Sequence, residues 1–164
     1  MPYSEALRAY YLGGLETAPA VLNSLLGGLN ADDPIWDFQP YPDRFTLREV
    51  VAHLADWNGI YVERVDQTKN EDFPTLPNKD EGQIAIDHDY AHSNPVASLN
   101  RFMESRKAVV DQANSLDPAL WDRKAIREGV GELTIGDLIS IVSLHDAYHL
   151  RQVVDYQEKY RAAR

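Results

Sequence analysis

Apolar side chains recur at helical spacing in four segments of the chain, near residues 4–26, 46–67, 95–116 and 135–160. Apolar residues three or four positions apart lie on one face of an α-helix, and that face packs against the core. The stretches between these segments are rich in Pro, Asp and Gly, which favour turns and loops. The pattern predicts an all-α protein, a four-helix bundle with no strand of consequence.

Two of the predicted helices have clear starting motifs. Thr46 and Glu49 have the T-x-x-E spacing of a capping box, and Thr134 and Asp137 repeat this spacing in a looser form. In a capping box, these two side chains accept hydrogen bonds from backbone N–H groups that the first helical turn leaves without partners. We therefore expect helices to begin directly after Thr46 and Thr134.

The segment 68–93, between the second and third predicted helices, differs in composition from its neighbours. It is polar and acidic and contains Pro74, Pro77 and Gly82. This composition predicts a long irregular crossover rather than a fifth helix, and a loop of this length usually has a function or is mobile. A chain of 164 residues can bury one core without disulfides, so we expect a single domain over residues 1–164.

Composition narrows the possible partners and metal ligands. The chain has no Cys, so a metal site must be built from imidazole, carboxylate or water. A formal net charge of −10, with no stripe of Lys and Arg, argues against nucleic acid. No window approaches the roughly 20 apolar residues that span a bilayer, and the N-terminus lacks an export signal. We expect a soluble, cytoplasmic protein that binds neither nucleic acid nor membrane.

Two histidines lie on the apolar face of the helix predicted over residues 135–160. His145 and His149 are four residues apart, which places their Cβ atoms about 5–6 Å apart on one helix face. Such a pair can bind one metal ion, or it can be a pair of core residues hydrogen-bonded to neighbours. His53 is the only other histidine on a predicted helix. We predict that His53, His145 and His149 together bind one divalent metal ion.

Four further polar residues have both a functional and a structural interpretation. Asp56 follows His53 by one turn, and Gln152 follows His149 by three residues, so each could orient a ligand imidazole or bind a water on the metal. Solvated surface positions are the alternative for both. His88 and His92 lie in the acidic crossover, where we interpret them as surface residues rather than a second metal site.

The sequence F-T-L-R-E-V-V-A-H-L-A-D-W at residues 45–57 and L-H-D-A-Y-H-L-R-Q at residues 144–152 resemble motifs of the DinB/YfiT-like family. The resemblance covers nearly the whole chain. It implies a four-helix bundle that binds a metal through one His of the second helix and two of an H-x-x-x-H pair. These positions fall on His53, His145 and His149.

The same resemblance implies bacterial cytoplasmic proteins, often homodimeric, that bind zinc or nickel. Some members transfer low-molecular-weight thiols, and others act as hydrolases. Apolar residues in excess of a narrow stripe on the first and third predicted helices also favour a homodimer. The donor chemistry alone does not select the metal, because imidazole suits zinc, nickel, copper and iron.

Three functions fit these residues. The leading hypothesis is a thiol transferase with a small-molecule substrate, in which the metal lowers the pKa of a thiol from a cosubstrate. The alternative is a hydrolase in which the metal brings the pKa of water toward about 7 and Asp56 or a neighbouring acid accepts the proton. The third is a stress-response protein whose metal only ties two helices together.

Solvent access at the metal distinguishes the two enzyme hypotheses from a metal that only joins two helices. In each case metal occupancy should fall as pH drops through the usual His range, near about 6.5.

Overall fold

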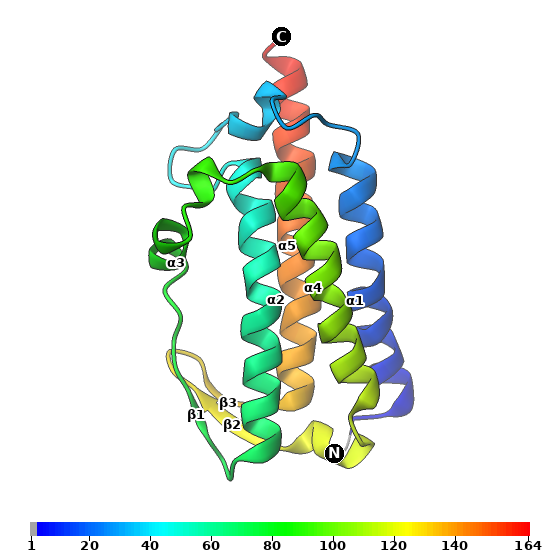
Figure 1. Ribbon diagram of the computed structural model, residues 1–164. Coiled ribbons are helices and arrows are strands. Elements are labelled where there is room, and N and C mark those ends of the chain that lie inside the picture. The colour runs from blue at the N-terminus through cyan, green and yellow to red at the C-terminus, as the bar shows by residue number, and fades with distance from the viewer. Residues whose placement is uncertain (1–2) are drawn as a thin grey trace.

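The computed structural model describes residues 3–164, and its main body is a bundle of long helices (Figure 1). The bundle helices agree closely with the four segments expected from the apolar pattern, so the predicted four-helix bundle is confirmed. They are α1 (Glu5–Leu26), α2 (Leu47–Asn70), α4 (Pro95–Ser115) and α5 (Ile135–Ala162).

Both predicted capping boxes are present. Thr46 accepts a hydrogen bond from the Glu49 N–H, and the Glu49 carboxylate accepts one from the Thr46 N–H at 2.8 Å. Thr134 and Asp137 make the same reciprocal pair at the start of α5. These caps fix where α2 and α5 begin and so help to set which of their residues face inward.

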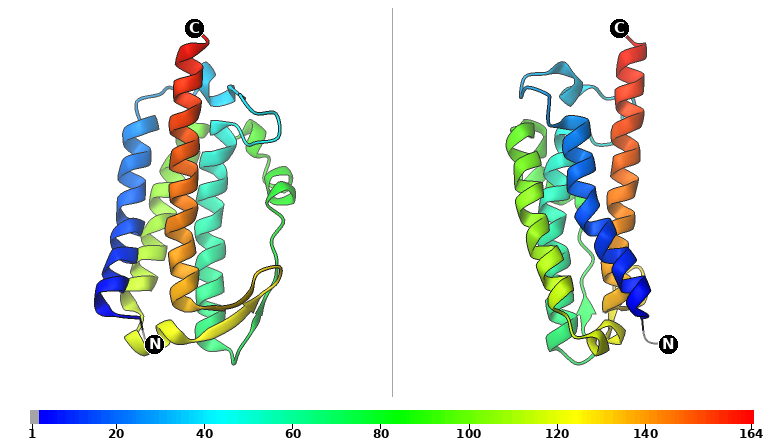
Figure 2. Two further views of the ribbon diagram at one scale, coloured as in Figure 1. Left: turned by 180° about the vertical axis from the view of Figure 1, so that it is seen from behind. Right: turned by 90° about the vertical axis from the view of Figure 1, so that its right-hand side faces the viewer.

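Each bundle helix packs against two others. Helix α2 contacts α4 and α5, and α1 contacts the same two helices from the other side. Figure 2 shows this arrangement from behind, with α5 in front and α1 and α2 on either side of it. The direct contact between α2 and α5 brings the middle of these two helices together.

Buried apolar residues of the described chain form two clusters, one toward each end of the bundle. In α2, residues 47–55 belong to one cluster, and Trp57, Tyr61 and Val65 belong to the other. In α5 the first cluster contains Val153 and Tyr156, whereas the second ends at Val142. The two clusters meet near residues 53–57 in α2 and 145–149 in α5, and polar side chains enter the core at this level.

The crossover after α2 is more regular than its composition predicts. It contains a short helix, α3 (Glu81–Asp87), and a 3₁₀ turn, η2 (Tyr90–His92), so the prediction of no fifth helix was wrong. Asp80 provides the physical reason, because its side chain accepts a hydrogen bond from the Gln83 N–H and caps the first turn of α3. Two further 3₁₀ turns, η1 (Pro34–Asp37) and η3 (Pro118–Asp122), follow α1 and α4.

The expectation of no strand of consequence also needs correction. Strands β1 (Thr75–Leu76), β2 (Lys124–Arg127) and β3 (Gly131–Thr134) form a small sheet within residues 3–164. Strands β2 and β3 are an antiparallel hairpin, and Gly129 and Gly131 in and after its turn have positive φ values of 76° and 110°. Strand β1 pairs parallel to β2 and ties the crossover to the hairpin.

In the part of the chain that the structure describes, no helix has the length and apolar character needed to cross a membrane.

Candidate metal centre

The three predicted ligand histidines meet between α2 and α5. His53 comes from the middle of α2, and His145 and His149 are one turn apart on α5. The Nε2 atom of His145 lies 2.9 Å from Nε2 of His53 and 3.2 Å from Nε2 of His149. His53 and His149 are buried, and His145 is partly exposed. One nitrogen of each ring therefore points to a common centre.

The spacing of these nitrogens fits a bound divalent ion. Imidazole nitrogens about 2.0–2.1 Å from a tetrahedral zinc ion lie roughly 3.3 Å from one another. An Nε2 atom has at most one hydrogen, so Nε2 of His145 cannot donate to both of its neighbours. A cation at the centre would accept all three lone pairs. Among residues 3–164 the cluster contains three donor side chains, which leaves a coordination position without a protein ligand.

Gln152 orients the ring of His149. The side-chain oxygen of Gln152 lies 3.0 Å from Nδ1 of His149 and can only accept, so Nδ1 has the hydrogen. The Gln152 amide group donates to the carbonyl of Phe45 and to the hydroxyl of Tyr156, which fixes its orientation. The lone pair of His149 is thereby held on Nε2, facing the cluster.

Burial keeps the three imidazoles uncharged. It lowers the pKa of His53 to about 2, with a further contribution from the two neighbouring histidines. It lowers the pKa of His145 to about 3, assisted by His149 and then by the charges of Arg106 and Arg127. It lowers the pKa of His149 to about 4, although the hydrogen bond to Gln152 acts in the opposite direction. At neutral pH all three rings can donate a lone pair to a metal.

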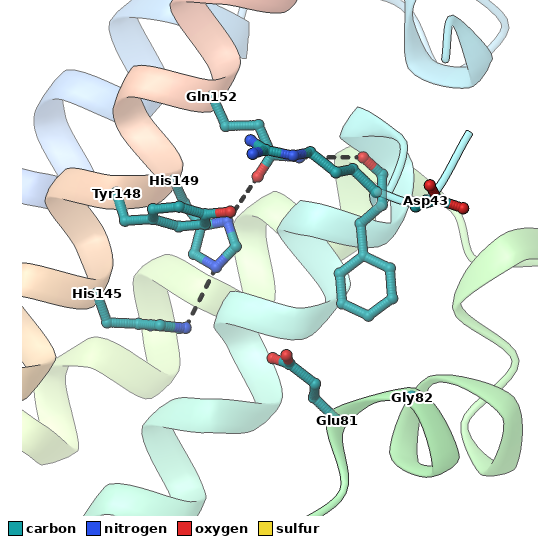
Figure 3. Close-up of a pocket in the computed structure, with 9 residues that line it drawn as sticks. Asp43, Glu81, Gly82, His145, Tyr148, His149 and Gln152 are labelled. Atoms are coloured by element: carbon teal, nitrogen blue, oxygen red, sulfur yellow. Dashed lines mark hydrogen bonds between the residues drawn. The ribbon is translucent and has the colours of Figure 1, made fainter. Parts of the chain in front are cut away.

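A pocket of about 580 Å³ opens onto this cluster, with His145 and His149 in its wall. The remaining lining comes from the loop before α2, from the start of α3 and from α5, and consists of Asp43, Arg44, Phe45, Glu81, Gly82, Tyr148 and Gln152. Figure 3 shows the Glu81 side chain extending from α3 into the space in front of the two histidines. The fourth position at the centre is thus within reach of a small molecule.

Aromatic rings pack around the cluster. The ring centroid of Trp57 lies 5.3 Å from that of His53 and 5.8 Å from that of His145, and Phe45 lies 5.4 Å from His53. Trp57 is buried and belongs to the apolar core. These rings hold the imidazoles in place and keep the environment of the cluster apolar.

Asp56, by contrast, is engaged away from the cluster. Its carboxylate contacts Nδ1 of His88 at 2.6 Å, accepts from the Tyr90 hydroxyl at 2.8 Å and pairs with Arg101 at 2.9 Å. Asp56 therefore connects α2 to the crossover. His92 is exposed and contacts Asp89, and neither His88 nor His92 joins the three-histidine cluster.

Two features near the centre escaped the sequence reasoning. Glu81 was expected to lie in an irregular loop, although Asp80 and Gln83 have the spacing of a helix cap that would have placed it on a first turn. Arg106 and Asp146 form a buried two-pronged ion pair with distances of 2.6 and 2.7 Å, directly beside His145. The position of Arg106 on the apolar stripe of its helix indicates a buried charge that requires an acidic partner.

A comparison with known families gives this arrangement a context. The model that describes the DinB superfamily matches residues 14–153. The chain belongs to the DinB superfamily. The resemblance inferred from the histidine motifs is therefore confirmed.

A solved structure supports the same fold for this DinB-superfamily chain. It is the structure of YfiT from Bacillus subtilis, which is described as a probable metal-dependent hydrolase with an unusual four-helix bundle topology. The match has a TM-score of 0.87 and 19% sequence identity, and it covers 96% of this chain and 90% of the other. At this identity the likeness shows the fold. A search among curated proteins found no match.

Proposed function

We propose that this protein is a metal-dependent hydrolase whose ion is bound by His53, His145 and His149. The observation on which the proposal rests is the convergence of three Nε2 atoms at a pocket, where residues 3–164 supply three protein donors rather than four. Three ligands and an open position are typical of catalytic zinc sites, whereas structural sites usually have four protein ligands. Zinc and nickel are the proposed ions, because both bind imidazole well.

A divalent ion in this site would act as a Lewis acid that polarises the bond to be cleaved and lowers the pKa of an attacking water. The residues of the chain then have distinct tasks. Gln152 keeps His149 in the tautomer that binds metal. Glu81 reaches into the pocket and is our candidate to accept the proton from water (Figure 3). Arg44 and Tyr148 line the same pocket and can donate hydrogen bonds to negative charge that develops on the substrate.

The fold comparison supports this proposal in one respect. The Bacillus subtilis YfiT structure, which has the same fold, is described as a probable metal-dependent hydrolase. The pocket also argues against a metal that serves only to join α2 and α5, because a structural tie needs no access from solvent.

Transfer of a thiol is the second candidate. A pocket of about 580 Å³ can admit a small organic molecule rather than water alone, and a thiolate is a good ligand for zinc. Because the chain has no Cys, the sulfur would come from a low-molecular-weight cosubstrate. The same three histidines would hold the ion, so the two candidates differ in the nucleophile and not in the metal ligands.

The two candidates can be separated by a paired screen of zinc-loaded and nickel-loaded protein. One arm offers ester, amide and phosphoester substrates in water, and the other offers an electrophile with a small thiol. We expect turnover in the hydrolytic arm without thiol, and its loss in His149→Ala but not in His92→Ala. Turnover only in the presence of a thiol would contradict hydrolysis and support thiol transfer. No turnover in either arm would contradict both proposed functions.

A further inference from the structure

Two arginines beside the candidate metal centre have no acidic partner within residues 3–164. Arg64 of α2 is only 4% exposed, and its Nε and Nη1 atoms are buried without a hydrogen-bond partner. Its third nitrogen reaches the Pro77 carbonyl at 3.5 Å, which is a marginal contact. Nε of Arg127 in β2 is also buried without a partner. Neither arginine belongs to any salt bridge of the described residues.

The lack of partners is not a shortage of acids. The chain has 26 Asp and Glu residues against 16 Lys and Arg residues, so carboxylates are in surplus. The other buried arginine of the bundle, Arg106, has a two-pronged carboxylate partner in Asp146. Arg64 and Arg127 are therefore different, because the fold provides one arginine with its counter-charge and leaves these two without one.

The small sheet brings these two arginines together. Arg127 pairs in register with Leu76 of β1, and the next residue after Leu76 is Pro77, whose carbonyl faces Arg64. Figure 1 shows these strands beside the C-terminal half of α2, where Arg64 lies. Burial, together with the nearby charge of Arg127, lowers the pKa of Arg64. Two positive groups thus share a poorly solvated region.

This region adjoins the three-histidine cluster. The guanidinium carbon of Arg64 lies 5.4 Å from the ring centroid of Trp57, and the same ring is 5.8 Å from that of His145. Tyr61 forms a second bridge, 5.7 Å from Arg64 and 6.2 Å from His145. One aromatic ring therefore separates the guanidinium from a candidate metal ligand.

The crossover connects the two places. Pro77 faces Arg64, and Glu81, four residues later, lines the pocket at His145 and His149. This stretch of the crossover thus runs from the arginines to the wall of the pocket at the histidine cluster.

Buried guanidinium donors without partners are costly, and two like charges in a low dielectric add to the cost. A carboxylate or phosphate group relieves both, because its oxygens match the planar fork of Arg and neutralise the charge. The Arg64 guanidinium packs over the rings of Trp57 and Tyr61, and its Nε and Nη1 atoms have no hydrogen-bond partner. The arrangement is preorganised for an anion.

We propose that Arg64 and Arg127 bind the carboxylate or phosphate group of a small substrate whose reactive bond lies at the three-histidine centre. This inference rests on the proposed function for the identity of the reactive end, but binding of the anion itself requires no metal. It narrows the substrate class of the proposed hydrolase to small anionic molecules.

The test is a titration of metal-free protein with inorganic phosphate and, separately, with acetate at constant ionic strength. The side-chain Nε–H resonances of Arg64 and Arg127 are followed by NMR. We expect a saturable shift of both resonances with at least one anion, while Arg161, which is exposed on α5, does not respond. Saturation with phosphate or with acetate identifies the group that the subsite prefers.

Variants give the control. Arg64→Met and Arg127→Met should each weaken anion binding about tenfold or more, because each removes charge-assisted hydrogen bonds. Arg161→Met removes the same charge elsewhere and should leave the affinity unchanged. Arg127 is the less buried of the pair, so Arg127→Met provides the comparison if Arg64→Met does not fold.

Absence of a saturable shift in the wild type, or equal affinity in Arg127→Met and Arg161→Met, would overturn the inference. The metal content of the same proteins is measured separately. Anion binding without metal binding would leave this subsite standing and contradict the proposed function. Metal binding without anion binding would contradict the anion subsite and leave the proposed function standing.

Discussion

Gln152 accepts a hydrogen bond from Nδ1 of His149 at 3.0 Å, and this contact fixes which nitrogen of the ring faces the candidate metal centre. Loss of such a partner typically weakens metal binding by about 10- to 100-fold. We therefore expect Gln152→Ala to lower the zinc affinity by this factor, measured by competition with a chromophoric chelator. The three ligands remain in this variant, so binding should be weakened and not abolished.

Gln157 offers a matched control on the same helix. Its side chain is buried and donates to the carbonyl of Leu25, away from the histidine cluster. Gln157→Ala removes a buried amide but should leave the zinc affinity unchanged. Equal losses in the two variants would mean that Gln152 acts through general stability and not through the tautomer of His149.

Glu81 is expected to act in chemistry and not in metal binding. Removing a general base typically lowers the rate by about 10²- to 10⁴-fold. Glu81→Gln should therefore reduce kcat in this range while the metal content stays near one equivalent. Steady-state kinetics and elemental analysis of the same sample provide the measurement. Unchanged kcat would exclude Glu81 as the proton acceptor.

The pH dependence of stability follows from the lowered pKa values of the histidines. In the unfolded chain each imidazole titrates near about 6.5, whereas in the fold the pKa values lie at about 2 for His53, 3 for His145 and 4 for His149. Between about pH 4 and pH 6.5 the unfolded state binds more protons than the folded state. The free energy of unfolding is therefore highest above about pH 6.5 and declines as pH falls toward 4. Three such groups give a slope of up to about 4 kcal/mol per pH unit.

Urea unfolding of metal-free protein at several pH values tests this slope. His53→Ala removes one of the three groups and should reduce the slope by about 1.4 kcal/mol per pH unit. An unchanged slope in this variant would contradict burial of a neutral His53.

The same pKa values revise the expectation from sequence that metal leaves near pH 6.5. Protons compete directly for the folded site only near pH 4 and below, so metal should be retained to lower pH.

The ion pair between Arg106 and Asp146 joins α4 to α5 directly beside His145. Removing one partner of a buried pair leaves an uncompensated charge and typically costs about 3–5 kcal/mol. Asp146→Ala should lower the free energy of unfolding by this amount in chemical denaturation. Asp155→Ala on the same helix breaks only an exposed contact with Lys159 and should change stability by less than about 0.5 kcal/mol. Similar losses in both variants would contradict a stabilising role for the buried pair.

Local sequence patterns predicted the parts of this fold that depend on one helix at a time. The start of α2 was predicted from Thr46 and the start of α5 from Thr134, and apolar stripes predicted which face of each helix is buried. The three histidines fall on these buried faces. The expectation that they meet came from His53 being the only other histidine on a predicted helix, and the family motifs supported it. The predicted homodimer and the predicted cytoplasmic location stay predictions.

Features that depend on contacts between distant segments were not predictable in this way. Strand β1 has only two residues, and its pairing with Arg127 spans about fifty positions, which no local pattern reveals. Asp56 lies one turn from His53 along α2, yet its side chain turns to His88 and Tyr90 of the crossover. Sequence spacing gives the helix and its period, whereas the choice among possible partners is made by tertiary packing.

The central claim is that His53, His145 and His149 bind one divalent ion. The most direct test is elemental analysis of protein purified without added metal and without a histidine-rich tag. We expect about one equivalent of metal in the wild type and in His92→Ala, because His92 lies outside the cluster. His149→Ala should retain almost none, since two ligands no longer preorganise the site. Equal metal content in the wild type and in His149→Ala would contradict the three-histidine centre.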